Sequence, residues 1–164
     1  SSVSWGGSAT IRDIGLTEKI KAGNYQAYDR DPLPPEEQME LYRKVFSMDY
    51  YLTSTNAITT DGLMVNVHGN SNRIAAIAFG PKHVIVVTGV NKIVPTEAVA
   101  ITRARTIAAP INSVRFQGNK PCILTGTCHN CLSPDCICNE ILITRRSKPA
   151  GRIIVVVVGE DLGF

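Results

Sequence analysis

All five cysteines of the chain lie in one short segment, with the spacing Cys122-x5-Cys128-x2-Cys131-x4-Cys136-x-Cys138. The C-x2-C pair Cys128 and Cys131 can place two thiolates on one metal from a single tight turn, and Cys122 and Cys138 can complete the coordination from either side. Four thiolates suit tetrahedral zinc and a four-iron cluster equally well. The spacing therefore predicts an iron–sulfur cluster or zinc at these four cysteines, without deciding between the two.

Three other interpretations of these thiols stay open: buried reduced side chains, a disulfide pair, and a redox-active C-x2-C. An odd number of cysteines in one short loop argues against a complete disulfide set, and a redox pair needs no further cysteines. Cys136 is left out of the predicted ligand set because Cys136-Ile137-Cys138 places alternate residues on the same face. His129 is a weaker substitute ligand.

A glycine pair near the start of the chain has the pattern of an anion-binding loop. Gly6 and Gly7 come directly after a predicted strand, so their backbone N–H groups can approach an anion, while Ser8 and Thr10 add hydroxyl donors. The alternative is a tight strand-to-helix turn with Ser8 as the helix cap, because a full G-x-G-x-x-G is absent.

Further polar residues surround a second predicted helix start and the end of a later strand. Asparagines in turns often have only a structural role, which is the alternative for this group. Lys92 is the best polar residue at a strand end, with a solvated lysine as the alternative. The residues predicted here to bind a ligand are Asn56, Asn66, Gly69, Asn70, Arg73 and Lys92.

Strands and helices alternate along most of the chain, which indicates a mostly parallel sheet covered on both faces, in a three-layer Rossmann-like α/β fold. A cysteine loop at residues 119–139 interrupts the pattern. Residues 153–158 are all apolar, so we expect this strand in the sheet interior, with Glu160 and Asp161 beside the cleft if it runs parallel to the first strand. The predicted strands are 3–5, 25–28, 50–55, 83–88, 140–145 and 152–158, with a hairpin of 57–59 and 63–67, and the longer helices are 35–46, 69–78 and 95–108.

The bulk composition is that of one ordinary globular domain over residues 1–164, with 44% hydrophobic and 19% charged residues. The net charge of +3 is scattered, which does not favour nucleic-acid binding. The longest apolar run, 153–158, is far below the roughly 18 residues that a membrane span requires. We expect a cytoplasmic protein that binds a small anionic molecule, and association into a homo-oligomer stays open.

Four stretches of the chain together resemble the LUD, or lactate-utilisation, domain family, and the match spans essentially the whole sequence. It is closest to stand-alone members with a cysteine loop like that of residues 121–139. Members normally carry a helical segment before the position of Ser1, so we expect this chain to lack about 40 residues. The stretches are Val3-Ser4-Trp5-Gly6-Gly7-Ser8, Leu52-Thr53-Ser54-Thr55-Asn56-Ala57-Ile58, Gly89-Val90-Asn91-Lys92-Ile93-Val94 and Val158-Gly159-Glu160-Asp161-Leu162-Gly163-Phe164.

The resemblance implies a fold similar to the NagB/RpiA/CoA-transferase-like group, in which the loops at residues 6–10 and 69–73 face a shared ligand cleft. The paired catalytic carboxylates of that group are missing from residues 56–61, and no nucleophile–base pair names a reaction. Two hypotheses follow. The first is a metal- or cluster-bearing accessory subunit in the oxidation of lactate or a similar hydroxy acid, with other oxidation subunits as partners. The second is a CoA- or sugar-phosphate-type binding enzyme with a structural metal.

Overall fold

The computed structural model describes residues 1–164 and divides the chain into two compact units. Unit 1 contains Ser1–Ser54, Ala75–Val90 and Ser147–Gly163, and unit 2 contains Thr55–Ile74, Asn91–Arg146 and Phe164. Each unit has its own sheet. The expectation of a single domain over residues 1–164 stays a prediction.

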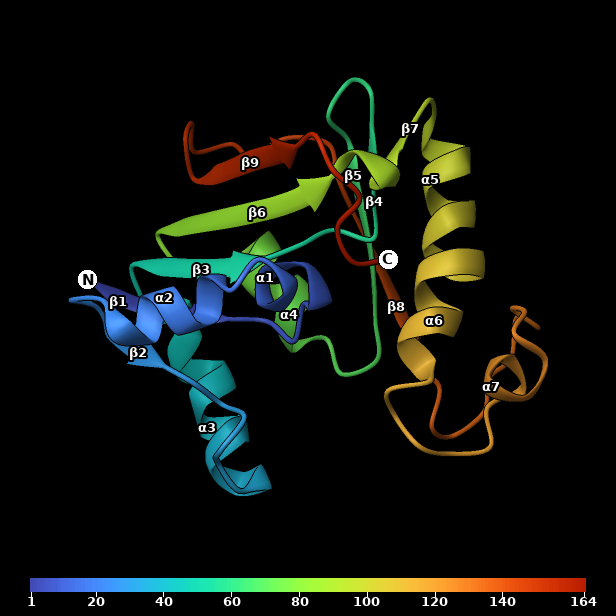
Figure 1. Cartoon of the computed structure of the whole chain (residues 1–164), viewed down its shortest axis with the longest axis horizontal. Helices are drawn as coiled ribbons and strands as arrows, with labels where there is room; N and C mark the ends of the chain where they lie inside the picture. Colours follow the sequence, from blue (N-terminus) through green and yellow to red (C-terminus); the bar gives the residue numbers. More distant parts are fainter. The chain divides into compact units, whose positions relative to one another are not determined.

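Unit 1 is built on a sheet of five parallel strands in the order β2-β1-β3-β6-β9 (Figure 1). The chain passes from β1 to β2 on one side and then crosses to β3 on the other side. This order creates a topological switch point at the carboxyl ends of β1 and β3, where open α/β sheets bind ligands. The strands are β1 Ser2–Trp5, β2 Gln26–Tyr28, β3 Tyr50–Thr53, β6 His83–Gly89 and β9 Ile153–Val158.

Two helices of unit 1 begin at residues whose types favour a helix start. Ser8 caps the first helix, since its Oγ accepts a hydrogen bond from Ile11 N at 3.4 Å, and Pro35 occupies the first turn of the third. The helices are α1 Ala9–Asp13, α2 Leu16–Ala22 and α3 Pro35–Lys44, which continues into the 3-10 turn η1 Val45–Ser47; α4 Asn72–Ala78 has residues in both units.

A compact apolar core joins the sheet of unit 1 to its first two helices. Trp5, Leu52 and Val87 come from three neighbouring strands, and Ile11 and Ile20 come from α1 and α2; all five are buried and packed together. Burial of this apolar surface is the main force that holds α1 and α2 on the sheet.

The position of β9 corrects the expectation that residues 153–158 lie in the sheet interior. β9 pairs only with β6, so it is the edge strand, as Figure 1 shows. Ile154, Val155, Val156 and Val157 are 36–50% exposed. An apolar run indicates a buried environment on average, but it does not specify how many strands pair with it, and this prediction was wrong.

Unit 2 contains a separate mixed sheet of four strands in the order β7-β4-β5-β8. The predicted hairpin is confirmed as the antiparallel pair β4–β5. The strand predicted at residues 140–145 is β8, which also pairs antiparallel with β5. The sequence pattern gave no sign that these strands leave the parallel sheet, because alternation predicts a strand and not its partner. The strands are β4 Ala57–Thr59, β5 Met64–His68, β7 Ile93–Val94 and β8 Glu140–Thr144.

One long helical stretch covers the sheet of unit 2. It begins at the Thr96 cap as predicted and extends to Ser113, past the expected end near residue 108. Its alanines at 100, 104 and 109 pack on Ala57, Val65 and Val67, because small side chains permit close approach of helix and sheet. The stretch consists of α5 Glu97–Arg103, the π-helical turn η3 Ala104–Ala108 and α6 Ala109–Ser113; the 3-10 turn η2 Val90–Lys92 precedes β7, and α7 is Pro121–Thr125.

The fold class is therefore confirmed as α/β, with a mostly parallel central sheet and flanking helices. Every helix is too short or too polar to traverse a lipid bilayer.

Candidate cysteine site and anion-binding loops

A buried lysine links two parts of the cysteine segment, residues 119–139. Lys120, only 2% exposed, precedes Cys122, and its Nζ lies 3.8 Å from the carboxylate of Asp135, which precedes Cys136. The same ammonium donates to the carbonyls of Phe116 and Gln117 at 3.3 and 3.4 Å. These contacts bring residues 120 and 135 together, with Cys122, Cys128 and Cys131 in the stretch between them.

Cys138 is the cysteine best embedded in the protein. It packs against the apolar core of unit 2 and directly precedes β8, whose pairing with β5 fixes its position. Burial is the main cause that raises the pKa of its thiol to about 12, and the neighbouring thiols of Cys136, Cys128 and Cys122 contribute to the same shift. A bound cation would favour the thiolate forms of these side chains.

Cys136 contacts cysteines on both sides, although it is outside the ligand set predicted from spacing. Its Sγ accepts a hydrogen bond from Cys138 N at 3.3 Å and donates to Cys131 O at 3.9 Å. A hydrogen bond from Ser133, whose Oγ lies 3.3 Å from Cys131 Sγ, lowers the pKa of the Cys131 thiol. Because the chain folds back at Ser133, alternation along an extended strand does not describe this segment.

The structure does not bring three or more cysteine, histidine, aspartate or glutamate side chains into an arrangement that could hold a metal ion. All five cysteines are free and partly exposed. His129 points its Nε2 to Thr125 Oγ1, at 2.7 Å, and not to a sulfur. The thiol-rich, half-buried surroundings of Cys138 suit a thiophilic metal or cluster, and the four-cysteine site stays a prediction.

The predicted ligand loop before α4 lies directly against the cysteine segment. Asn139 Nδ2 donates to Gly69 O at 3.0 Å and to Cys136 O at 3.2 Å, and so joins the two. Ser71, with a left-handed φ of 62°, hydrogen-bonds Glu140 through its hydroxyl. Asn70 lies in the same loop, where its N donates to His68 Nδ1 at 3.3 Å. Two sites that were predicted separately are therefore neighbours within unit 2.

Three of the predicted binding residues form one polar cluster. The guanidinium of Arg73 donates to Asn66 Oδ1 at 2.6 Å, to Asn56 Oδ1 at 3.1 Å and to Val67 O at 2.9 Å. Asn66 is fully buried, and its Nδ2 has no hydrogen-bond partner. A buried donor without an acceptor is costly, so it is a natural place for a ligand oxygen.

Two more residues of unit 2, Lys92 and Arg103, are buried cations. Lys92 is 2% exposed in η2, which overturns the alternative of a solvated lysine. Arg103 on α5 donates to Asn56 O at 2.6 Å and to Asn91 O at 3.2 Å, and its burial lowers its pKa. Arg103 was not predicted, although its spacing from Ala100 and Ala104 places it on the inward face of the helix.

The glycine loop of unit 1 lies at the switch point between β1 and β3. Gly6 N donates to Leu52 O at 3.0 Å, which holds the loop against β3. Ser8 is the helix cap, which was the alternative to a role in binding. Thr10 Oγ1 donates to Leu162 O at 3.3 Å. Three of the four predicted ligand donors, Gly6, Ser8 and Thr10, therefore already make hydrogen bonds within the protein.

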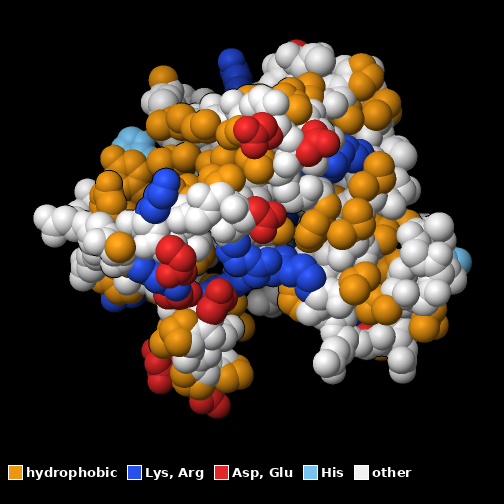
Figure 2. All heavy atoms as spheres, viewed as in Figure 1, with side chains coloured by type: hydrophobic (Ala, Val, Ile, Leu, Met, Phe, Trp, Pro, Cys, Tyr) orange, Lys and Arg blue, Asp and Glu red, His pale blue; other side chains and the backbone are white.

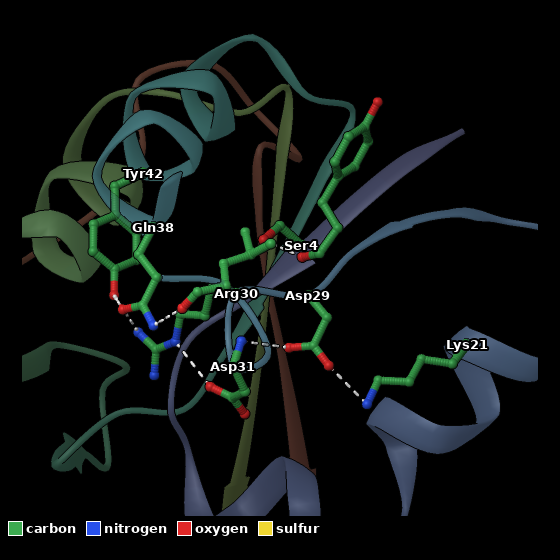
Figure 3. Close-up of polar contacts among 9 residues, drawn as sticks. Ser4, Lys21, Asp29, Arg30, Asp31, Gln38 and Tyr42 are labelled. Carbon is green, nitrogen blue, oxygen red and sulfur yellow. Dashed lines mark hydrogen bonds and ion pairs between the residues drawn. The ribbon is translucent and has the colours of Figure 1, made fainter. Parts of the chain in front are cut away.

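Arg30 supplies a positive charge to this loop that the sequence did not reveal. A β-carbon on residue 7 would overlap its Nη2, so the guanidinium lies directly over the glycine backbone. Figure 3 shows Arg30 held between the carboxylate of Asp31, 3.3 Å from its Nε, and the hydroxyl of Tyr42, 3.4 Å from its Nη1. Arg30 lies in a loop without periodicity, and no sequence signal marks it.

Loops 6–10 and 69–73 belong to different units, so the shared ligand cleft stays a prediction.

With a mostly parallel sheet and flanking helices, the chain is an α/β protein with a Rossmann-like fold. It belongs to the LUD domain family, whose model matches residues 1–158. Among solved structures it is similar to a DUF162 family protein from Deinococcus radiodurans, at 13% identity and a TM-score of 0.46, over 97% of this chain and 88% of that one. The comparison with curated proteins gives no match.

Proposed function

We propose that this protein is an accessory subunit that carries an iron–sulfur cluster or zinc and acts in the oxidation of lactate or a similar hydroxy acid. The observation that supports the proposal is that all five cysteines are free and lie between residues 122 and 138, where Cys136 contacts both Cys131 and Cys138. Membership of the LUD domain family supports the link to lactate utilisation. When bound, a cluster would supply one-electron transfer, whereas zinc would supply only a structural cross-link.

The residues of this chain have separate roles in that proposal. Cys122, Cys128, Cys131 and Cys138 are the ligands predicted from spacing, and Cys136 joins them because of its contacts with Cys131 and Cys138. Lys120 and Asp135 close the segment. Other oxidation subunits are the proposed partners, since a carrier of single electrons needs a donor and an acceptor.

Anaerobic purification, followed by an absorption spectrum and elemental analysis, tests this proposal. A broad absorbance near about 400 nm with bound iron and sulfide supports the cluster, and a colourless protein with one zinc supports the structural metal. Cys138→Ala should lose the metal, whereas His129→Ala should retain it because its Nε2 is engaged by Thr125. A protein that binds neither metal after anaerobic reconstitution contradicts the proposal.

A second candidate is a small-molecule-binding enzyme of the CoA or sugar-phosphate type, in which the metal is structural. The observation that favours it is the position of Gly6 and Gly7 at the β1–β3 switch point, under the guanidinium of Arg30. Backbone N–H groups and a guanidinium together suit a phosphate. Calorimetric titration with inorganic phosphate and with CoA tests it, and the absence of heat with both contradicts it.

A further inference from the structure

The edge strand β9 exposes more apolar surface than the rest of the parallel sheet. Ile154, Val155, Val156 and Val157 are 44%, 36%, 43% and 50% exposed. Successive residues of a strand point to opposite faces, so both faces of β9 are open to water. Ile153, the first residue of β9, is also only partly buried.

β9 also lacks the features by which proteins normally protect an edge. It pairs with β6 over its full length, from Ile153 to Val158, and carries no charge, proline or bulge. Its outer side therefore presents a regular row of unpaired N–H and C=O groups beside β-branched side chains. Figure 2 shows hydrophobic side chains gathered over the region of β9 and β6.

Phe79 extends this apolar edge at the end where β9 begins. It is 83% exposed, and it lies in the segment that Arg152 holds through its bonds to Ile77 O and Pro81 O, at 2.8 and 3.2 Å. We call the set of Phe79, Ile154, Val155, Val156 and Val157 the β9 edge.

The charges that flank β9 favour pairing of the strand with itself. Lys148 and Arg152 precede it, and Glu160 and Asp161 follow it, with Lys148, Glu160 and Asp161 exposed. In an antiparallel pair, the basic end of one strand lies opposite the acidic end of the other. A parallel pair would bring like charges together, which is destabilising.

We propose that the β9 edge is a homodimer interface, in which β9 pairs antiparallel with β9 of a second copy. A two-fold axis between Val155 and Val156 places Val155 opposite Val156 of the partner subunit and Ile154 opposite Val157 of the partner subunit. Arg152 then lies opposite Gly159 of the partner subunit, beside its acidic tail. The two five-stranded sheets become one continuous sheet without an exposed apolar edge, and the closed symmetry prevents further growth.

Sedimentation equilibrium of the full-length protein tests this interface. The wild type is expected to be a dimer at about 0.1 mM and above, and Val156→Lys is expected to be monomeric at the same concentrations because two lysines would meet near the axis. Ile143→Lys is the matched control: Ile143 is 36% exposed on β8, the edge strand of the other sheet, and the dimer should persist. Far-UV circular dichroism and a cooperative melt verify that both variants fold.

Charge exchange tests the antiparallel direction independently of the strand itself. Lys148→Glu and Glu160→Lys should each weaken the dimer by about threefold to tenfold in moderate salt, and the double variant should recover most of the affinity. A monomeric wild type overturns the proposal, as does a dimer that survives Val156→Lys. Open-ended aggregates, or a double variant weaker than both single variants, overturn the two-fold antiparallel arrangement.

Discussion

Gly69 lies in close contact with Ile137: a β-carbon on residue 69 would come within 3.0 Å of the Ile137 α-carbon and 3.4 Å of the Cys136 carbonyl oxygen. The atoms that approach are backbone atoms, which cannot rotate away as the end of a side chain can. The loop that leads into α4 therefore packs closely on the cysteine segment. A metal that orders this segment would also restrict the conformation of the loop.

Gly69→Ala should disturb this contact. The added methyl group forces the two backbones apart, at an expected cost of about 1–2 kcal/mol in the free energy of unfolding, and should lower the metal occupancy of the cysteine segment. Gly159→Ala is the matched control, because no atom lies within 4 Å of its β-carbon position. Chemical denaturation and elemental analysis measure the two effects. Equal stability and metal content in the two variants would show that the contact is loose.

Cys136→Ala should lower bound iron or zinc at least about tenfold, because the variant removes the sulfur that contacts both Cys131 and Cys138. Ser133→Ala is the control: it removes the hydroxyl 3.3 Å from Cys131 Sγ but leaves every sulfur in place. Metal content per chain is measured after anaerobic reconstitution. A full metal content in Cys136→Ala would favour the ligand set predicted from spacing, which does not include Cys136.

The elements of the fold were predictable because each depends on local signals. Ser8 and Thr96 cap helices and Pro35 begins one, as their residue types indicate. Pairing was less predictable: the apolar strand at residues 153–158 became an edge, and the strand at residues 140–144 joined a second sheet. Periodicity records which residues avoid water, but not which strand becomes the neighbour.

The candidate site was predictable where residues cluster in sequence and not where the fold assembles them. The cysteine segment and the Asn56, Asn66 and Arg73 cluster follow from residue type and spacing. Arg30 reaches Gly7 only because β2 lies beside β1 in the sheet, so its role depends on tertiary structure. The contacts of Cys136 with Cys131 and Cys138 were not foreseen because the rule of alternation was applied to a segment that is not a strand, and its exclusion from the ligand set stays a prediction.

Arg152→Met should destabilise unit 1 by about 2–3 kcal/mol. The guanidinium donates to Ala76 O at 2.9 Å and Ile77 O at 2.8 Å, which are carbonyls in the last turn of α4, and to Pro81 O at 3.2 Å in the loop after it. Lysine cannot replace this fork of donors, so Arg152→Lys should recover little. Urea denaturation measures the loss, with Arg146→Met, at an exposed position, as the control. A loss equal to that of the control would mean that water replaces the guanidinium without cost.

Asp49 should make stability depend on pH in the acid range. Its carboxylate accepts hydrogen bonds from Lys82 Nζ at 2.8 Å and from Ser2 N and Oγ at 2.9 and 3.1 Å, which hold its pKa well below the usual value of about 3.9. A lowered pKa in the folded state adds stability above pH about 4 that is lost as the pH falls further. Asp49→Asn should flatten the acid limb of a plot of melting temperature against pH, whereas Asp13→Asn, at an exposed position on α1, should leave that limb as in the wild type.

Gly7→Ala separates the structural role of the glycine loop from its role in binding. Gly7 has no left-handed φ that would exclude alanine, and the atom that blocks a β-carbon is the far end of the flexible Arg30 side chain. The fold should therefore tolerate the methyl group, with a change in stability below about 1 kcal/mol, while Arg30 is displaced from the loop.

If the loop and Arg30 together bind an anion, Gly7→Ala should weaken phosphate binding at least about tenfold, since it removes both the close backbone approach and the guanidinium. Arg30→Gln should weaken it by a similar factor, because only the charge is lost while the loop is unchanged. Calorimetric titration with inorganic phosphate measures both affinities, and thermal melts measure stability. Phosphate binding at wild-type strength in both variants would mean that Gly6 and Gly7 form only a strand-to-helix turn, which the hydrogen bond from Gly6 N to Leu52 O holds against β3.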